Sequence, residues 1–203
     1  ITSLIDSAII MVTSPVIVTI LSFFILKTSL TKNKIAGISL GLLGAVLLIS
    51  LGNDESNKLS SVSGNLLIMA NATSYSIYLV LIKPLMNKYK PITVISYMFT
   101  FAFFVVLPFG ISDVQDFSFD FPPIVLGSIA FIVVFTTFCT YLFNIFAVKQ
   151  LSPTIASSYI YLQPLLATFF AIMLKKDVLT LKIAFCSCLI FAGLYLVSVK
   201  KAK

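Results

Sequence analysis

The sequence predicts an all-α, polytopic membrane protein with seven transmembrane helices. Of its 203 residues, 59% are hydrophobic and only 10% are charged, whereas a soluble domain carries about 25% charged residues. Apolar runs near the length of about 20 residues that crosses a bilayer recur seven times along the chain. Segments such as 35–51 are apolar on every side, unlike the alternating apolar and polar pattern of membrane β-strands, and this favours helices.

The predicted spans are residues 4–26, 35–51, 62–82, 92–111, 122–148, 154–174 and 183–199. The first and sixth carry a proline at their centres, Pro15 and Pro164, and each proline frees a carbonyl one turn earlier, near Met11 and Ile160. The second and seventh are short, so we expect them to stand upright in the bilayer or to let lysines at their ends snorkel, and the fifth is long enough to tilt. The third is rich in polar residues at its centre, and the fourth is rich in phenylalanine.

The lysines predict how these helices are oriented. All 14 basic residues are lysine, and most lie in short clusters between the apolar runs. If the loop Lys27 to Lys34 is cytoplasmic, ten lysines fall on that side and four on the other. The positive-inside rule therefore predicts that the C-terminus is in the cytoplasm. We expect the chain to lie in the plasma (inner) membrane. The clusters are not interleaved with aromatic residues on a polar face, so no nucleic-acid partner is expected.

The chain contains an internal repeat. Residues 1–50 align without a gap on residues 150–199 at an offset of 149, which pairs Pro15 with Pro164 and Gly44 with Gly193. Five spans separate equivalent points, so the two copies are inverted in the membrane, as in many secondary transporters. The expected organisation is the last two helices of a first repeat (1–51), an outer linker (52–61), a complete five-helix repeat (62–200) and a cytoplasmic tail (201–203).

This organisation describes part of a 5+5 inverted-repeat, ten-helix protein. It predicts three further helices before residue 1, roughly 85 to 100 residues at about 30 residues for each span and loop. The alternative is a processed protein of seven helices.

Two stretches resemble the EamA-type transporters of the drug/metabolite transporter superfamily. GNLLIMANATSYSIYLVLIKPLMNKYKP, with Gly64, Ser74, Tyr78 and Lys83, is similar to the start of an EamA repeat, and TYLFNIFAVKQLSPTIASSYIYLQPLLATFFAI is similar to its later helices. Members often have a Gly-Glu pair where this chain has Lys27-Thr28 and Lys176-Asp177. The resemblance implies solute transport by alternating access, with export as the expected direction.

Polar residues near the centres of four spans identify a candidate cavity. They share helical faces at spacings of three or four residues. The predicted substrate-binding residues are Ser14, Asn71, Ser74, Tyr75, Tyr78, Thr137, Thr140, Asn144, Tyr161 and Gln163. For any single Ser or Thr the alternative is a bond to its own backbone or to a neighbouring helix.

Asp6 is the one carboxylate inside a predicted span, which makes it a candidate for proton coupling or an outer gate. The alternative is an interfacial residue at a helix start. Gly37, Gly41 and Gly44 form a strip for helix packing, or else a contact in a homodimer. Cys139, Cys186 and Cys188 have no pattern of metal ligands, and no metal or cofactor is expected.

Three functional classes fit a polytopic membrane chain. A transporter of small solutes accounts for the repeat and for the polar centres of four spans. A membrane scaffold or assembly protein, the alternative, needs no polar centres. An enzyme is not expected, because the chain lacks histidine and lacks paired aspartates within the spans.

Overall fold

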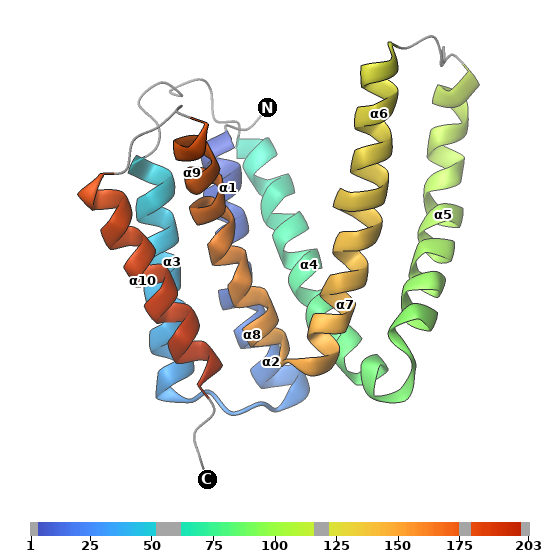
Figure 1. The fold of residues 1–203 in the computed structure, drawn as a ribbon. Helices are drawn as coiled ribbons and strands as arrows, with labels where there is room; N and C mark the ends of the chain where they lie inside the picture. The colour runs from blue at the N-terminus through green and yellow to red at the C-terminus, as the bar shows by residue number, and fades with distance from the viewer. Residues whose placement is uncertain (1–3, 52–61, 116–121, 175–179, 200–203) are drawn as a thin grey trace. The chain divides into compact units, whose positions relative to one another are not determined.

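The computed structural model describes residues 4–51, 62–115, 122–174 and 180–199, and these form helices joined by short turns (Figure 1). Seven of the described segments are long and apolar enough to cross a membrane, which confirms the predicted number of spans. The linker 52–61 and the tail 201–203 lie outside the described residues.

Several spans are built from more than one helical element. In chain order the elements are α1 (Leu4–Val12), α2 (Ser14–Leu26), α3 (Lys32–Leu51), α4 (Val62–Lys88), α5 (Pro91–Gln115), α6 (Pro123–Phe131), the π-helix η1 (Ile132–Cys139), α7 (Thr140–Gln150), α8 (Pro153–Ser158), the 3₁₀ turn η2 (Tyr159–Tyr161), α9 (Leu162–Met173) and α10 (Leu181–Ser198).

Packing divides the chain into two compact units. The first contains residues 1–81 and 152–203, and the second contains residues 82–151. The first unit therefore combines helices from both of the predicted repeats. The two repeats are inferred from the alignment of residues 1–50 with residues 150–199 and not from packing, so the division into repeats stays a prediction.

In the first unit, the two spans that carry the paired prolines are both interrupted just before the proline. The first breaks at Thr13, whose amide and hydroxyl both donate to the Ile10 carbonyl, at 3.0 and 2.6 Å. The sixth narrows to the 3₁₀ turn Tyr159–Tyr161 before Pro164. A proline cannot make the usual backbone bond and crowds the preceding turn, which favours a break at that point. Pro84 and Pro108 lie inside α4 and α5 without a break, so proline alone does not determine the two interruptions.

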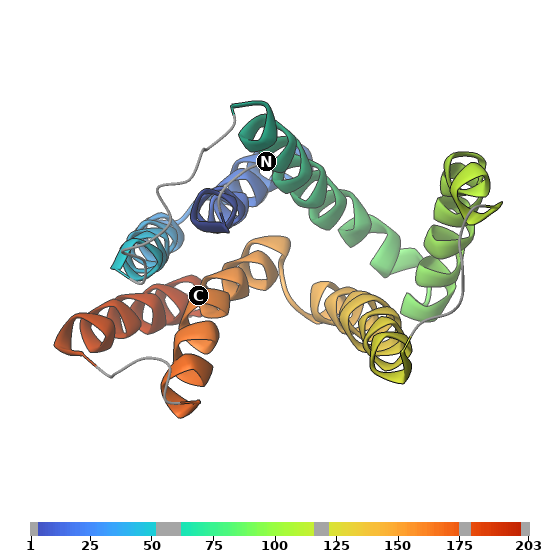
Figure 2. The same cartoon turned by 90° about the horizontal axis from the view of Figure 1, so that it is seen from above.

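Helices α3 and α10 pack closely through glycines and lie side by side in both views (Figures 1 and 2). A methyl group on Gly193 would lie 2.6 Å from the Gly37 carbonyl oxygen, and one on Gly44 would lie 3.0 Å from the Cys186 carbonyl oxygen. The packing interpretation of the glycine strip is confirmed. Within one copy, α10 and Tyr161 occupy this strip, and a homodimer stays a prediction.

The core of the first unit lies where α1, α3, η2 and α10 meet. It is a cluster of buried, mainly aliphatic side chains: Val12, Ala45, Leu48, Ile49, Ile160, Tyr161, Cys186 and Ile190. Burial of aliphatic carbon stabilises such a cluster less in lipid than in water, so close packing carries the association.

Lys27 ends α2 in the left-handed conformation, with φ 51° and ψ 35°. The amides of Lys27 and Thr28 both donate to the Ser22 carbonyl, the latter at 3.2 Å. This is the arrangement in which helices favour glycine. The EamA-type transporters that this chain resembles often have glycine at this position, and here a lysine adopts the conformation that suits glycine.

In the second unit, α5 packs against α7. The Phe99 ring contacts the rings of Phe138 and Tyr141, with centroids 6.4 and 5.9 Å apart. The fifth span changes from α to π geometry over Ile132–Cys139, and the Thr140 hydroxyl donates to the Phe135 carbonyl, five residues back, at 3.0 Å. The fifth span is therefore helical throughout its described length, with π geometry over these residues.

Lys83 joins the end of α4 to the end of α7 within the second unit. Its ammonium donates to the carbonyls of Val148 at 2.7 Å, Lys149 at 3.1 Å and Leu151 at 2.8 Å. An ammonium has three N–H donors, so this group is fully used. The last carbonyls of a helix lack backbone partners and carry partial negative charge, and a cation satisfies both needs.

Candidate functional site

A cavity of about 370 Å³ in the first unit combines apolar walls with one amide side chain. Its wall is formed by Ser7, Ala8, Met11, Val12, Ile49, Gln163, Pro164 and Ala167, from α1, α3 and α9. The two helix breaks bring these residues together, since Met11 and Val12 directly precede the first break and Gln163 follows the second. Gln163 is exposed to the cavity, and its amide forms no hydrogen bond with the described part of the chain.

On the other side of the breaks, small side chains fill the contact between two helices. Helices α2 and α8 pack against each other. Their buried residues are Ser14, Pro15, Val18, Thr19 and Ser22 on α2 and Pro153, Thr154, Ser157 and Ser158 on α8. Thr19 donates to the Pro15 carbonyl at 2.8 Å, and Ser157 and Ser158 donate to the Thr154 carbonyl at 3.0 and 2.7 Å. Each of these three hydroxyls thus bonds to its own helix.

Ser14, a predicted solute-binding residue, lies in α2, which packs against α8. It is fully buried, and its carbonyl accepts a bond of 3.3 Å from the Ser76 hydroxyl on α4. The Ser14 hydroxyl itself has no partner among the described residues. Ser22, which the sequence analysis did not single out, is also fully buried. Its hydroxyl has no hydrogen-bond partner among the described residues.

The predicted polar residues of α4 share one face of that helix. Asn71 and Ser74 are exposed, Tyr75 and Tyr78 are half-buried, and the two tyrosine rings lie 6.0 Å apart. The opposite face, with Ala72, Ser76 and Leu79, is buried. The helical spacing therefore identified a polar face, and this face is not part of the cavity wall around Gln163.

Tyr161 packs inside the first unit. Its side chain is fully buried, its hydroxyl donates to the Ile38 carbonyl at 3.3 Å, and its ring lies against Gly41. A methyl group on Gly41 would come within 2.6 Å of the Tyr161 Cε2 atom. In this structure, both the ring and the hydroxyl of Tyr161 are used in packing against α3.

Thr137, Thr140 and Asn144 belong to the second unit. Thr140 is exposed, whereas Thr137 and Asn144 are half-buried. The prediction that they share a face assumed α-helical spacing. A π turn holds more residues than an α turn, so that spacing does not hold for Thr137, which lies in η1.

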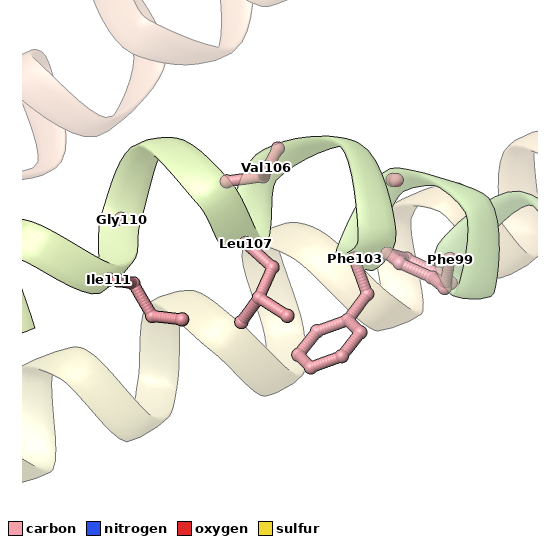
Figure 3. Close-up of a pocket in the computed structure, with 7 residues that line it drawn as sticks. Phe99, Phe103, Val106, Leu107, Gly110 and Ile111 are labelled. Carbon is pink, nitrogen blue, oxygen red and sulfur yellow. The ribbon is translucent and has the colours of Figure 1, made fainter.

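A larger hollow of about 690 Å³ runs along α5, and its wall has only apolar side chains and a glycine (Figure 3). Figure 3 shows Phe103 and Leu107 projecting from the same stretch of this helix. No side chain in the wall offers a hydrogen bond to a polar solute. In a membrane-spanning helix, this composition suits contact with lipid chains.

Asp6 belongs to α1, and its side chain lies outside the described part of the structure. Among the described residues, no group of three or more potential metal ligands of the His, Cys, Asp or Glu type comes together.

Lys83 makes the interaction between helices that the sequence analysis missed. Its position one residue before Pro84, near the end of α4, was the available signal.

Comparison with known proteins gives a consistent result. Residues 62–199 match the EamA-like transporter family. An uncharacterized transporter of Archaeoglobus fulgidus is 27% identical over 93% of this chain and 65% of its own length. The uncharacterized transporter YyaM of Bacillus subtilis is 28% identical over 80% of this chain and 54% of its own. The chain thus spans less than two thirds of the length of these relatives.

One solved crystal structure has the same fold. It superposes with a TM-score of 0.75 at 19% identity, over 97% of this chain and 68% of that one. At 19% identity, this match shows a shared fold and nothing about shared function.

Proposed function

Because the chain belongs to the EamA-like transporter family, we propose that it is a secondary transporter of small metabolites. It acts by alternating access through a central cavity and exports its solute across the plasma membrane, with its C-terminus in the cytoplasm. The excess of lysines at one set of loops supports this orientation.

The observation that carries the proposal is the contrast between the two sides of the helix breaks in the first unit. On the side of α2 and α8, small residues pack tightly. On the side of α1 and α9, a cavity of about 370 Å³ holds Gln163. A site open on one side and closed on the other is what alternating access requires, and discontinuous helices line such sites in many transporters.

The hydrogen bonds at the closed side suit a contact that opens. Thr19, Ser157 and Ser158 donate to carbonyls of their own helices. Separating α2 from α8 would leave these three bonds intact. The change would therefore cost mainly the packing of small side chains, which is modest in a membrane.

The contacts between α3 and α10 support two inverted copies. Gly193 lies against Gly37, and Gly44 lies against Cys186. Adding 149 to 44 gives 193, and adding 149 to 37 gives 186, so the offset of the repeat converts one contact into the other. Reciprocal contacts of this kind arise when two equivalent elements pair about a two-fold axis.

The proposal is tested by solute export from cells that produce the protein. Cells loaded with metabolites of several classes should retain at least one of them less than cells without the protein. The same solute should accumulate in inside-out vesicles. Equal retention of every solute, with the protein present in the membrane at normal yield, would count against export.

A further inference from the structure

We propose that the cavity around Gln163 takes uncharged, mainly apolar solutes that carry an amide-like hydrogen-bonding group, and that it rejects ions. This inference rests on the proposed transport function and names the class of solute for the same site. It concerns the wall formed by α1, α3 and α9.

The chemistry of the wall supports the hydrogen-bonding part. Gln163 offers an acceptor oxygen and two N–H donors, and the amide forms no bond within the described part of the chain. Six of the eight wall residues (Ala8, Met11, Val12, Ile49, Pro164 and Ala167) have apolar side chains. A solute with a carbonyl and an N–H could accept a hydrogen bond from the Gln163 amide nitrogen and donate one to its oxygen. The apolar remainder of the solute would contact the aliphatic wall.

The charge of the wall supports the rejection of ions. None of the eight residues is charged. A buried ion without an opposite charge loses its hydration with little compensation. The chain has no arginine or histidine, and none of its 14 lysines is among the residues of this wall. A neutral solute avoids this loss.

The volume limits the size of the solute. Small-molecule pockets usually measure about 300 to 1,000 Å³, and this cavity lies near the lower end at about 370 Å³. Capped single amino acids have the right size and the right mixture of apolar and amide groups, which makes them suitable probes.

The test uses three probes with one side chain and different charge. N-acetyl-leucinamide is neutral, N-acetyl-leucine is an anion and leucinamide is a cation at neutral pH. Their binding to the purified protein in lipid nanodiscs is measured by equilibrium dialysis. We expect the neutral probe to bind at least tenfold more tightly than either charged one, and Gln163→Leu to weaken its binding about tenfold.

Gln163→Glu provides the decisive variant, because it adds a carboxylate to the wall without changing the shape of the side chain. It should bind leucinamide more tightly than the wild type does and should lose affinity for the neutral probe. Gln150→Leu, at the exposed end of α7, is the matched control and should bind all three probes as the wild type does.

Several results would overturn the inference while leaving transport possible. These are equal binding of the three probes, tighter binding of a charged probe, or no binding of the neutral one. Cation binding that disappears in Asp6→Asn would assign the selectivity to that carboxylate instead. Failure of the transport proposal would be seen separately, as the absence of export in cells.

Discussion

Gly37 and Gly193 lie against each other so closely that a methyl group on either would come within 2.6 Å of the other's carbonyl oxygen. The two backbones touch because neither residue has a side chain. The strip that the sequence identified on the second span therefore finds its partner in the last span of the same chain. This contact fixes the pairing of α3 with α10 in the core of the first unit.

Gly193→Ala should destabilise the protein by about 1 to 3 kcal/mol, because the added methyl group meets backbone atoms that cannot rotate away. The melting temperature in detergent, followed by circular dichroism, measures this effect. Gly127→Ala on α6 is the matched control, since a methyl group there meets nothing within 4 Å. Equal melting of the two variants would contradict the close contact.

Lys27→Gly should stabilise the protein by roughly 0.5 to 1 kcal/mol. A residue with a side chain is strained in the left-handed conformation, and Lys27 is the one non-glycine residue with positive φ in the described chain. Thr28→Gly, one position later, lacks this benefit and should leave the melting temperature unchanged or lower it. A lower melting temperature for Lys27→Gly than for the wild type would refute the strain.

Lys83→Met should loosen the end of α7, because it leaves three carbonyls without the ammonium. Hydrogen bonds to a charged group each contribute about 1.5 to 3 kcal/mol, although water at the helix end recovers part of this loss. Hydrogen exchange of the Leu151 amide, which donates to the Ala147 carbonyl at 2.7 Å, should accelerate at least tenfold.

Lys88→Met is the control for this prediction, since Lys88 lies in the last turn of the same helix and is exposed. Its exchange pattern at residues 145–155 should match that of the wild type. If both variants exchange alike, then the bond between α4 and α7 has no role in holding this turn.

The sequence was sufficient to predict the seven spans, because lipid requires long apolar segments with internally bonded backbone. It also predicted the packing role of Gly37 and Gly44, since small residues at helical spacing leave room only for close contact. The interruptions before Pro15 and Pro164 lie where the missing amide of proline weakens a helix. These features depend on local composition, which one sequence contains.

Other features depend on neighbours that one sequence does not reveal. The composition of the run at Ile132–Cys139 suits an α-helix as well as the π-helix that forms there, so it does not distinguish the two. Tyr161 at the centre of a span looks the same whether it faces a solute or Gly41 on another helix. Similarly, Lys83 resembles any lysine that flanks a membrane until the end of α7 is placed beside it.

The orientation of the chain is tested by cysteine labelling in a variant without native cysteines. Lys88→Cys and Asp116→Cys flank α5, a helix of 25 residues that extends about 37 Å at 1.5 Å per residue. We expect an impermeant reagent added outside intact cells to label position 116 and not position 88. Labelling of both from the same side would contradict the predicted topology.

The most direct test of the transport account is solute flux in proteoliposomes made with Gln163→Leu and Asn71→Ala. Both polar side chains are exposed in this structure, Gln163 in the cavity wall and Asn71 on the polar face of α4. The account predicts that each variant reaches the membrane at normal yield and that its flux falls at least fivefold, with Gln150→Leu unchanged. Wild-type flux in both variants would contradict it.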